Sequence, residues 1–350
     1  MNRRTLIKRI AALSAVNTKL PAFTTATLKE AAQQSGRILG VYVVAHDLQT
    51  TGPATDLIPR EFSLIADGND LKFSDRLRPS PDTFNFKLSD VVVNWAQQNR
   101  LLFRGHSFVW HRVLPKWFDG YVNKGNAEEV LKNHITTVMK HYAGRVYAWD
   151  VVNECLHDDG RPDMLRTKPW LDLIGPDYIE IAFRIASAAD RKAKLVLNET
   201  NIEQDLPGQE ERRKALLNLM KKLKHKNVPV TGLGVQGHLK ANAPLATDSL
   251  RNLLSNVRDM GFEIMVTELD VDDTGIPPNQ VDATIARTYA QFIQLVSPFT
   301  KIITFEQLVD DPNVAKKGAP HPRDLFATDG RKKPAYDHIA GALMSSPPPR

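Results

Sequence analysis

The chain has 350 residues, of which 42% are hydrophobic and 25% charged, a composition typical of a folded globular protein. It excludes a disordered, collagen-like or membrane-embedded class. The formal net charge of +6 comes largely from residues 1–26, which contain Arg3, Arg4, Lys8, Arg9 and Lys19 and no acidic residue. Because the remainder is nearly neutral, we expect neither nucleic-acid nor membrane binding.

Residues 1–26 predict an export signal. A basic start is followed by a short apolar run over residues 10–16 and by small residues around 24–26. The paired arginines resemble a twin-arginine address, so we expect a periplasmic or secreted protein. The alternative is a disordered or loosely helical N-terminus of a cytoplasmic protein. Residues 345–350 form a Pro-rich tail, which leaves 27–344 as one domain.

Short apolar runs alternate with longer amphipathic stretches along this domain. Strands are predicted over 38–44, 62–66, 101–108, 146–153, 193–198, 231–236, 263–268 and 301–305. Helices are predicted over 88–98, 127–142, 178–189, 210–224, 249–260 and 281–296. The pattern indicates an α/β protein with a single (β/α)8 TIM barrel. A doubly wound sheet is less well supported, because no glycine-rich phosphate loop follows the first predicted strand.

Polar side chains gather where the middle strands of this barrel are predicted to end. In TIM barrels, function collects at the carboxyl ends of the strands. The residues found there are His106, Trp110, Asn153, Glu154, Asn198, Glu199, Gln236, His238, Glu268 and Asp270. Taken singly, each could have a structural role, but five successive strands carrying such groups to one rim are difficult to explain by packing alone.

Two glutamates among these residues suit the cleavage of a glycosidic bond. One carboxylic acid protonates the leaving oxygen, and a second carboxylate attacks or stabilises the oxocarbenium-like centre. Glu154 and Glu268 follow the fourth and seventh predicted strands, so a closed barrel can place them on either side of a bound sugar. Four of the five tryptophans lie between residues 110 and 170, and clustered indoles suit stacking on sugar rings.

Four motifs resemble those of glycoside hydrolase family 10, which consists mainly of endo-β-1,4-xylanases. They are GHSFVWH at 105–111, WDVVNE at 149–154, GLGVQGHL at 232–239 and VTELDV at 266–271. The resemblance runs from about residue 36 to about residue 342. It implies a retaining β-glycoside hydrolase that cleaves xylan by double displacement, without a cofactor or a metal. We expect a monomer acting on a xylan-type polysaccharide or oligosaccharide.

The resemblance also implies roles for individual residues. Glu154 would be the acid/base and Glu268 the nucleophile. Asn153 would bind the sugar 2-hydroxyl, His238 would hydrogen-bond Glu268, and Asp270 would orient His238. The residues implied to hold the sugars next to the cleaved bond are Asn69, Lys72, His106, Trp110 and Gln236.

The chain departs from the family pattern on the side that binds the non-reducing sugars. Gly68 stands where a glutamate is usual, and Phe73 and Val113 replace a tryptophan and a glutamine. The eighth strand region reads ITFEQLVD at 303–310, so Glu306 replaces the first of two tryptophans. These changes predict retained chemistry with a remodelled substrate pocket. A neutral alternative is that Phe305 or a nearby loop restores the lost aromatic surface.

Three other functions remain open at this stage. The same chemistry could act on a different or decorated β-glycan. The missing aromatic residues would also fit a catalytically weakened carbohydrate-binding protein. A metal-dependent barrel hydrolase would use His106, His111, His238 and Asp270, but the first two lie five apart and point to opposite faces of a regular strand.

Overall fold

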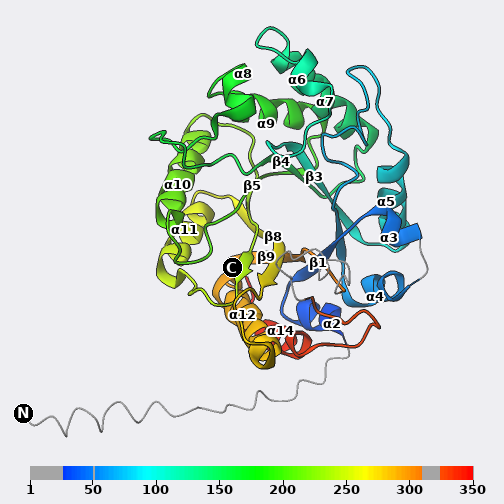
Figure 1. Ribbon diagram of the computed structural model, residues 1–350, viewed down its shortest axis with the longest axis vertical. Helices are drawn as coiled ribbons and strands as arrows, with labels where there is room; N and C mark the ends of the chain where they lie inside the picture. The colour runs from blue at the N-terminus through cyan, green and yellow to red at the C-terminus, as the bar shows by residue number, and fades with distance from the viewer. Residues whose placement is uncertain (1–26, 50–51, 310–323, 350) are drawn as a thin grey trace, which may run out of the picture.

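The computed structural model describes residues 27–49, 52–309 and 324–349, so the predicted export signal lies outside the described residues. Parallel strands form a closed barrel surrounded by helices (Figure 1). The eight barrel strands are β1 Ile38–Val43, β2 Leu64–Asp67, β3 Leu102–Val109, β4 Ala148–Asn153, β5 Lys194–Glu199, β6 Gly232–Val235, β8 Glu263–Asp272 and β9 Thr300–Phe305.

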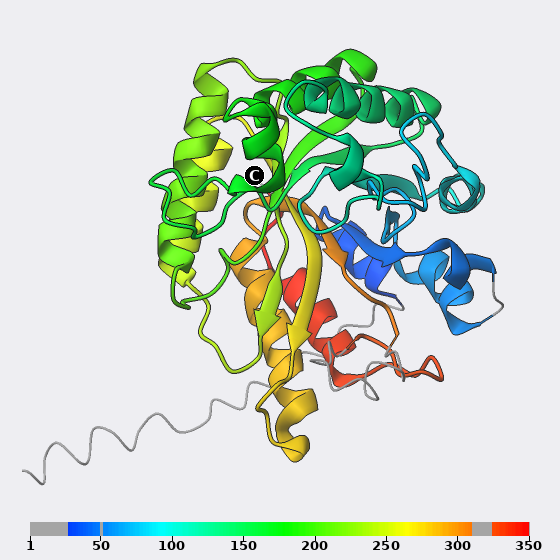
Figure 2. The same cartoon turned by 45° about the horizontal axis from the view of Figure 1, so that its top comes forward.

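The first and last barrel strands pair and close the barrel, and β6 pairs directly with β8, the next barrel strand along the chain. β1 pairs with β9 in the register Ile38↔Ile302, and β6 pairs with β8 in the register Gly232↔Glu263. A further short strand, β7 His238–Lys240, pairs only with the outer part of β8, His238 opposite Asp270. Figure 2 shows these two strands running side by side beyond the rim. The predicted (β/α)8 barrel is confirmed, with β7 as an addition that the sequence pattern did not predict.

Helices cover the outside of the barrel. The six helices predicted from periodicity appear within two residues of their predicted ends: α5 Lys87–Gln98, α7 Ala127–His141, α9 Tyr178–Ala189, α10 Gln209–His225, α11 Thr247–Asp259 and α12 Val281–Val296. The sequence pattern missed α2 Leu28–Gln34, α3 Ala45–Gln49, α4 Pro53–Glu61, α6 Phe118–Tyr121, α8 Asp172–Ile174 and α14 Pro334–Ser345. A π-helical turn at Thr167–Leu171 and a 3-10 turn at Pro278–Gln280 complete the described set.

Two apolar layers account for the stability of the barrel. The larger core lies between strands and helices, where α10 buries Leu216, Leu219, Met220 and Leu223 at three- and four-residue spacing. A separate cluster inside the barrel includes Leu64 and Ala148, the first residues of β2 and β4. Because this cluster fills the barrel interior at the amino ends of the strands, the polar interior residues collect at the carboxyl ends.

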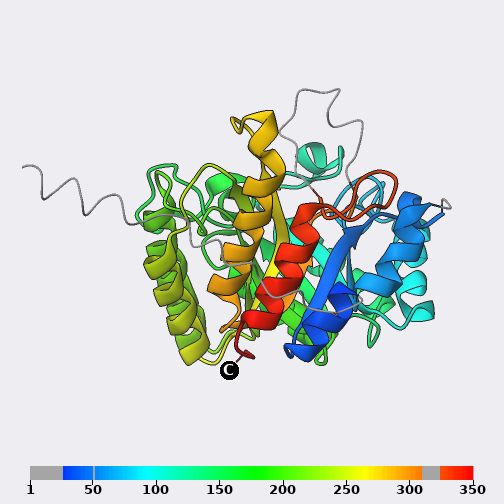
Figure 3. The ribbon, with the colours of Figure 1, turned by 90° about the horizontal axis from the view of Figure 1, so that it is seen from below.

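Polar contacts join the first and last helices. The Glu61 carboxylate of α4 accepts hydrogen bonds from the Leu28 amide (2.9 Å) and the Tyr336 hydroxyl (2.7 Å). Arg37, just before β1, donates to the carbonyls of Ser297 and Pro347. Figure 3 shows α2, α14 and α12 packed side by side. In the described part of the chain, no helix is both long enough and apolar enough to cross a membrane.

The clustered tryptophans divide between the core and the barrel rim. Trp149 is buried against Phe108, with ring centroids 4.5 Å apart, and a Cβ on Gly105 would lie 2.1 Å from its ring. Trp170 is also buried, and its Nε1 donates to the Trp110 carbonyl. The expectation that the whole cluster offers sugar-stacking surface is therefore wrong for Trp149 and Trp170, which fill the core.

Candidate active site

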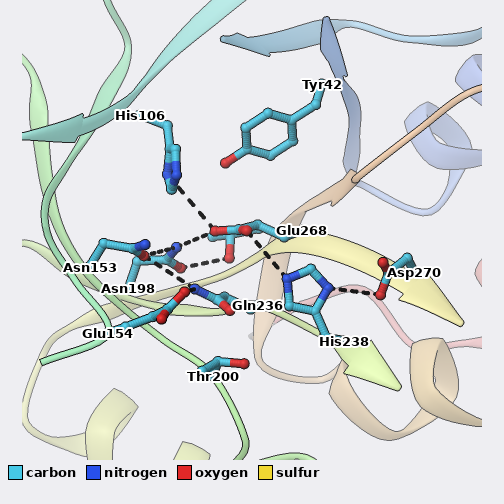
Figure 4. A network of polar contacts seen from close by, with 12 residues as sticks. Tyr42, His106, Asn153, Glu154, Asn198, Thr200, Gln236, His238, Glu268 and Asp270 are labelled. Atoms are coloured by element: carbon cyan, nitrogen blue, oxygen red, sulfur yellow. Dashed lines mark hydrogen bonds and ion pairs between the residues drawn. The ribbon is translucent and has the colours of Figure 1, made fainter. Parts of the chain in front are cut away.

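The carboxyl ends of β4, β5, β6 and β8 bring the predicted catalytic residues together (Figure 4). Asn153 ends β4, and Glu154 follows it with a φ of 52°, in the left-handed region that non-glycine residues rarely adopt. Glu268 lies within β8. The two glutamates are each 8% exposed. Both carboxylates are therefore largely buried at the rim, which limits competing hydration.

Glu268 is held from two sides. The Asn198 side-chain amide donates to Glu268 Oε1 at 2.6 Å. His238 Nε2 lies 3.4 Å from Glu268 Oε2, and His238 Nδ1 lies 2.8 Å from Asp270 Oδ1. The three side chains Glu268, His238 and Asp270 thus form a line of contacts at the outer ends of β7 and β8 (Figure 4).

A line of amides connects the two glutamates. Asn198 donates to Asn153 Oδ1 at 2.9 Å, and Gln236 Nε2 lies 3.2 Å from the same oxygen and 3.4 Å from Glu154 Oε1. Thr267 fixes Asn198 by donating to its Oδ1 at 2.6 Å. Asn153 Nδ2 and Gln236 Oε1 are buried without a hydrogen-bond partner among the described residues, so both are available to a ligand hydroxyl.

Glycine is required beside this line of amides. A Cβ on Gly234 of β6 would lie 2.2 Å from Asn198 Oδ1 and 2.9 Å from the Thr267 methyl. Any larger side chain would displace Asn198, which touches both Asn153 and Glu268. The sequence pattern placed Asn198 at a strand end but assigned it no role.

A buried ion pair lies below the rim. Arg104 of β3 bonds to Asp150 of β4, and it also donates to the Tyr42 hydroxyl (3.2 Å) and the Thr267 carbonyl (3.1 Å). His106 Nδ1 is 2.8 Å from Asp150 Oδ2 and 3.9 Å from Glu268 Oε1. Sequence reasoning missed Arg104 and Asp150. The alternation of side chains along a strand could have indicated Arg104, because it lies two residues before His106 and shares its face of β3.

These surroundings keep Glu268 ionised. Burial alone would raise its pKa, but His106, His238 and Arg104 outweigh burial and lower the pKa of Glu268 to about 2. Burial also lowers the pKa of His238, whereas Asp270 and Glu268 raise it well above its ordinary value. The pair Glu268–His238 is therefore a carboxylate facing an imidazolium, so Glu268 is ionised at neutral pH.

Glu154 also lies near basic side chains. Its Oε2 is 3.7 Å from Arg112 Nε and 4.0 Å from His111 Nδ1, and Arg166 Nε donates to its backbone carbonyl. Burial, together with Arg166 and Arg112, lowers the pKa of His111 to about 4. His111 is thus neutral at pH 7. The Gln236 amide lies 3.4 Å from Glu154 Oε1, whereas the Asn198 amide approaches Glu268 Oε1 to 2.6 Å.

The predicted sugar-binding residues fall into two groups in the structure. Lys72 Nζ lies 3.2 Å from Asn69 Oδ1 and 5.1 Å from the centre of the Trp110 ring. Trp110 in turn lies against His106, with ring centroids 5.9 Å apart. The structure therefore joins Asn69, Lys72, Trp110 and His106 in a chain of contacts, and Gln236 lies beside Glu154.

A pocket of about 600 Å³ adjoins this group, and its lining includes Tyr42, Asn69, Lys72 and Glu306. Phe305 does not contribute aromatic surface to it. The Phe305 side chain is fully buried and packs against Phe62 and Tyr289. The expectation that Phe305 restores the lost aromatic surface is therefore wrong, because the ring points into the core.

Among the described residues, the one group that could approach a metal ion is His106, Asp150 and Glu268. Asp150 already bonds to Arg104 and His106, so an incoming cation would compete with both. The four residues proposed for a metal-dependent hydrolase do not form such a group. The described residues instead provide an ionised carboxylate, Glu268, and a second carboxyl, Glu154, at the same rim. Amide side chains lie between these two groups, and the His238 imidazolium lies beside Glu268.

Comparison with known proteins agrees with this geometry. The sequence profile of Glycosyl hydrolase family 10 matches residues 27–342. The chain belongs to glycosyl hydrolase family 10. The family predicted from the four motifs is confirmed, and family 10 relatives among solved structures have the same barrel. Xylanase 10B from Thermotoga maritima superimposes with a TM-score of 0.82 at 32% identity, covering 91% of this chain and 98% of that chain.

Two curated relatives differ in how much of their length is shared with this family 10 chain. Exoglucanase XynX of Acetivibrio thermocellus is 34% identical over 326 residues, which is 88% of this chain but 29% of that protein. Beta-1,4-xylanase of Dictyoglomus thermophilum is 33% identical over 261 residues, 71% of each chain. The chain therefore spans less than a third of the first relative and most of the second.

Proposed function

We propose that this chain is a retaining endo-1,4-β-xylanase, with Glu268 as nucleophile and Glu154 as acid/base. The observation that carries the proposal is that Glu154 and an ionised Glu268 lie at the same rim. His106 and His238 lower the pKa of Glu268 to about 2, although burial alone would raise it. Support also comes from relatives described as xylanases and from a solved relative, xylanase 10B of Thermotoga petrophila, in complex with xylobiose.

The first step forms a covalent bond between Glu268 and the sugar. A Glu268 oxygen attacks the anomeric carbon while Glu154 gives a proton to the departing glycosidic oxygen. In the second step Glu154 takes a proton from water, and the water oxygen replaces Glu268 at the anomeric carbon. Two displacements restore the original anomeric configuration.

The surrounding residues position the groups that react. His238, oriented by Asp270, stabilises ionised Glu268, and Asn198 holds Glu268 and Asn153 in register. Asn153 Nδ2 is available to the sugar 2-hydroxyl. For the remaining predicted binding residues, we propose that Asn69, Lys72, His106, Trp110 and Gln236 contact the sugars next to the cleaved bond.

Substitution of the two glutamates separates their roles. Glu154→Ala should lower kcat/KM on xylan by about 100-fold or more, the usual contribution of a general acid, while sparing aryl xylosides whose leaving group needs no proton. Glu268→Ala should abolish turnover of both substrates. Initial rates with both substrates, and NMR of the first anomer released, measure this. Glu210→Ala, a partly exposed carboxylate on α10, is the matched control.

Equal and small effects of Glu154→Ala and Glu268→Ala would contradict the assignment. Release of the inverted anomer would contradict double displacement. Sugar binding without turnover by the unaltered chain would favour a carbohydrate-binding protein instead.

We further propose that residues 1–26 direct export and that the protein is a monomer. The basic start and apolar run of the leader support the first, and the second extends the expectation drawn from the family resemblance. N-terminal sequencing of the protein recovered outside the cytoplasm, and light scattering in solution, test the two statements.

A further inference from the structure

The backbone at Glu154 has a conformation that needs support from its surroundings. Its φ of 52° lies in the left-handed region, which costs free energy for a residue with a side chain. Such a conformation persists only where neighbouring contacts determine it. The next two residues, Cys155 and Leu156, are buried, so their backbone polar groups need partners inside the protein. The contacts of residues 154–156 therefore indicate what keeps the Glu154 carboxyl at the rim.

Glu199, the last residue of β5, provides one of these contacts. Its Oε2 accepts a hydrogen bond from the Leu156 amide at 3.0 Å, and its Oε1 accepts one from the Thr200 amide at 3.0 Å. The Cys155 thiol donates to the same Oε2 at 3.7 Å. Glu199 thus joins the segment that follows Glu154 to the end of β5.

Two arginines complete the support of this segment. Arg212 of α10 donates from Nη1 to the Leu156 carbonyl at 2.6 Å, and the same Nη1 lies 3.7 Å from Glu199 Oε1. Arg166 donates from Nε to the Glu154 carbonyl at 3.1 Å and from Nη2 to the Leu156 carbonyl at 3.3 Å. Glu199 and Arg212 therefore hold the amide and the carbonyl of one residue, two positions after Glu154.

Burial separates Glu199 from a bound sugar. Glu199 is 0% exposed, whereas Glu154 and Glu268 are each 8% exposed. Burial raises the pKa of Glu199 to about 7, and Glu154 adds to this rise, whereas Arg212 opposes it. The carboxyl groups of Glu199 and Glu154 thus interact electrostatically. Because Glu199 is not exposed, it acts on the reaction through the groups it contacts and not by touching the substrate.

We propose that Glu199 is a positioning residue for Glu154: by holding Leu156 together with Arg212, it keeps Glu154 in the left-handed conformation that places its carboxyl at the rim. The inference rests on the proposed function, which makes Glu154 the acid/base. Glu268 has none of these contacts, since it is held by other side chains. Loss of Glu199 should therefore impair proton transfer to the leaving oxygen more than attack by Glu268.

The test compares two substrates that differ in their need for a proton. The measured quantity is kcat/KM on a xylo-oligosaccharide divided by kcat/KM on an aryl xyloside whose leaving group needs no proton. Glu199→Ala should lower this ratio by about tenfold to 100-fold, the effect of misplacing a reacting group by about 1 Å. Glu199→Gln keeps one acceptor oxygen and should lower the ratio less. An unchanged ratio in Glu199→Ala overturns the proposal.

A second buried carboxylate provides the matched control. Glu61 is 1% exposed, accepts a hydrogen bond from the Leu28 amide and pairs with Arg60, but it lies just before the amino end of β2. Glu61→Ala should lower the Tm and leave the ratio unchanged. A ratio that falls as far in Glu61→Ala as in Glu199→Ala contradicts a specific role of Glu199.

A variant of Arg212 decides the matter if Glu199→Ala does not fold. Arg212→Met removes both the hydrogen bond to the Leu156 carbonyl and the contact with Glu199, and it retains an unbranched apolar side chain. A lowered ratio in this variant supports the proposal, and a ratio equal to that of the unaltered protein overturns it.

Crystal structures of the unaltered protein and of Glu199→Ala separate this inference from the proposed function. If the unaltered protein hydrolyses neither substrate, the proposed function fails, but the position of Glu154 still tests the inference. A Glu154 that leaves the left-handed region, or whose carboxyl moves away from Gln236, supports the positioning role. A Glu154 with the same φ and the same contact with Gln236 overturns it. Conversely, an active xylanase with an unchanged ratio in Glu199→Ala refutes the positioning role alone.

Discussion

His238 shows how single residues set the chemistry at this rim. The His238 ring lies between Asp270 and Glu268, and its raised pKa makes it a cation that stabilises the ionised carboxylate. The same residue occurs in a motif of the sequence, but only the structure places its two ring nitrogens against two different acids.

Replacement of His238 by glutamine should move the acidic limb of the pH–rate profile. Without the imidazolium, the pKa of Glu268 rises from about 2 toward its ordinary value, so more Glu268 is protonated and inactive in mildly acidic solution. The loss of a charged hydrogen bond should also lower kcat/KM about tenfold to 100-fold on the plateau. The measurement is kcat/KM on xylo-oligosaccharides across pH, and Asp270→Asn should give a smaller shift in the same direction. An acidic limb that stays in place would contradict the role of His238.

Burial and the neighbouring Glu268 raise the pKa of Glu306, and this raised pKa predicts how the stability of the protein depends on pH. In the unfolded chain its carboxyl ionises near its ordinary pKa of 4.5, whereas the folded protein retains the proton to about 8. Stability from this group is therefore complete below the unfolded pKa and falls as pH rises to about 8. Glu306→Gln removes this dependence, so the Tm of the variant minus that of the wild type should increase across this range.

Thermal unfolding at a series of pH values checks this expectation. Asp67 and Glu199, whose pKa values burial raises to about 7, produce a similar slope in both proteins and cancel in the difference. A difference in Tm that is constant with pH would show that Glu306 is not buried with its proton.

At the residue scale, the sequence motifs indicated that Glu154, Glu268, His238 and Asp270 lie at one rim, and the structure brings these residues together there. The sequence did not predict Asn198 as the link between Asn153 and Glu268, nor the Arg104–Asp150 pair below them. Those contacts join different strands, and their geometry depends on the barrel register, which a single sequence does not contain.

At the scale of elements, β6 controls the site through a missing side chain. Gly234→Ala should lower kcat strongly, by about 100-fold, because a Cβ 2.2 Å from Asn198 Oδ1 displaces the amide that touches both Asn153 and Glu268. Steady-state kinetics on xylan and thermal unfolding measure the effect. Gly120→Ala in α6, where nothing lies within 4 Å of the added Cβ, is the matched control. A Gly234→Ala protein with unaltered kcat would contradict the argument.

Long elements were predictable and short ones were not. The helices α9 and α12 begin and end at their predicted residues, because 12 and 16 residues of regular apolar spacing give a clear signal. In contrast, β7 has three residues and α6 has four, too few for any period to show. The helices α3 and α4 lie in a connection whose composition resembles a loop, with Pro59 inside α4.

At the scale of the whole molecule, Glu61 joins the first and last helices. Tyr336→Phe removes the hydroxyl that donates to the buried Glu61 carboxylate, so it should lower the free energy of unfolding by about 1–2 kcal/mol. Urea unfolding gives this value, and Tyr121→Phe, at a side chain 46% exposed, should change it little. If Tyr336→Phe and Tyr121→Phe change the free energy of unfolding equally, the Glu61–Tyr336 hydrogen bond contributes nothing measurable to stability.

The contact between the two ends of the described chain also permits a change in the order of its strands along the sequence. The carbonyl of Pro347 lies against Arg37, and Pro348 lies near Gly36, so the last described residues meet the turn between α2 and β1. That meeting point is at the amino end of β1, whereas Glu154 and Glu268 are at the carboxyl ends of their strands. A short peptide could therefore connect the region after α14 to α2, and new ends could be opened in an outer loop. Such a circular permutant would have the same barrel and the same arrangement of Glu154 and Glu268, with its strands encoded in a different order.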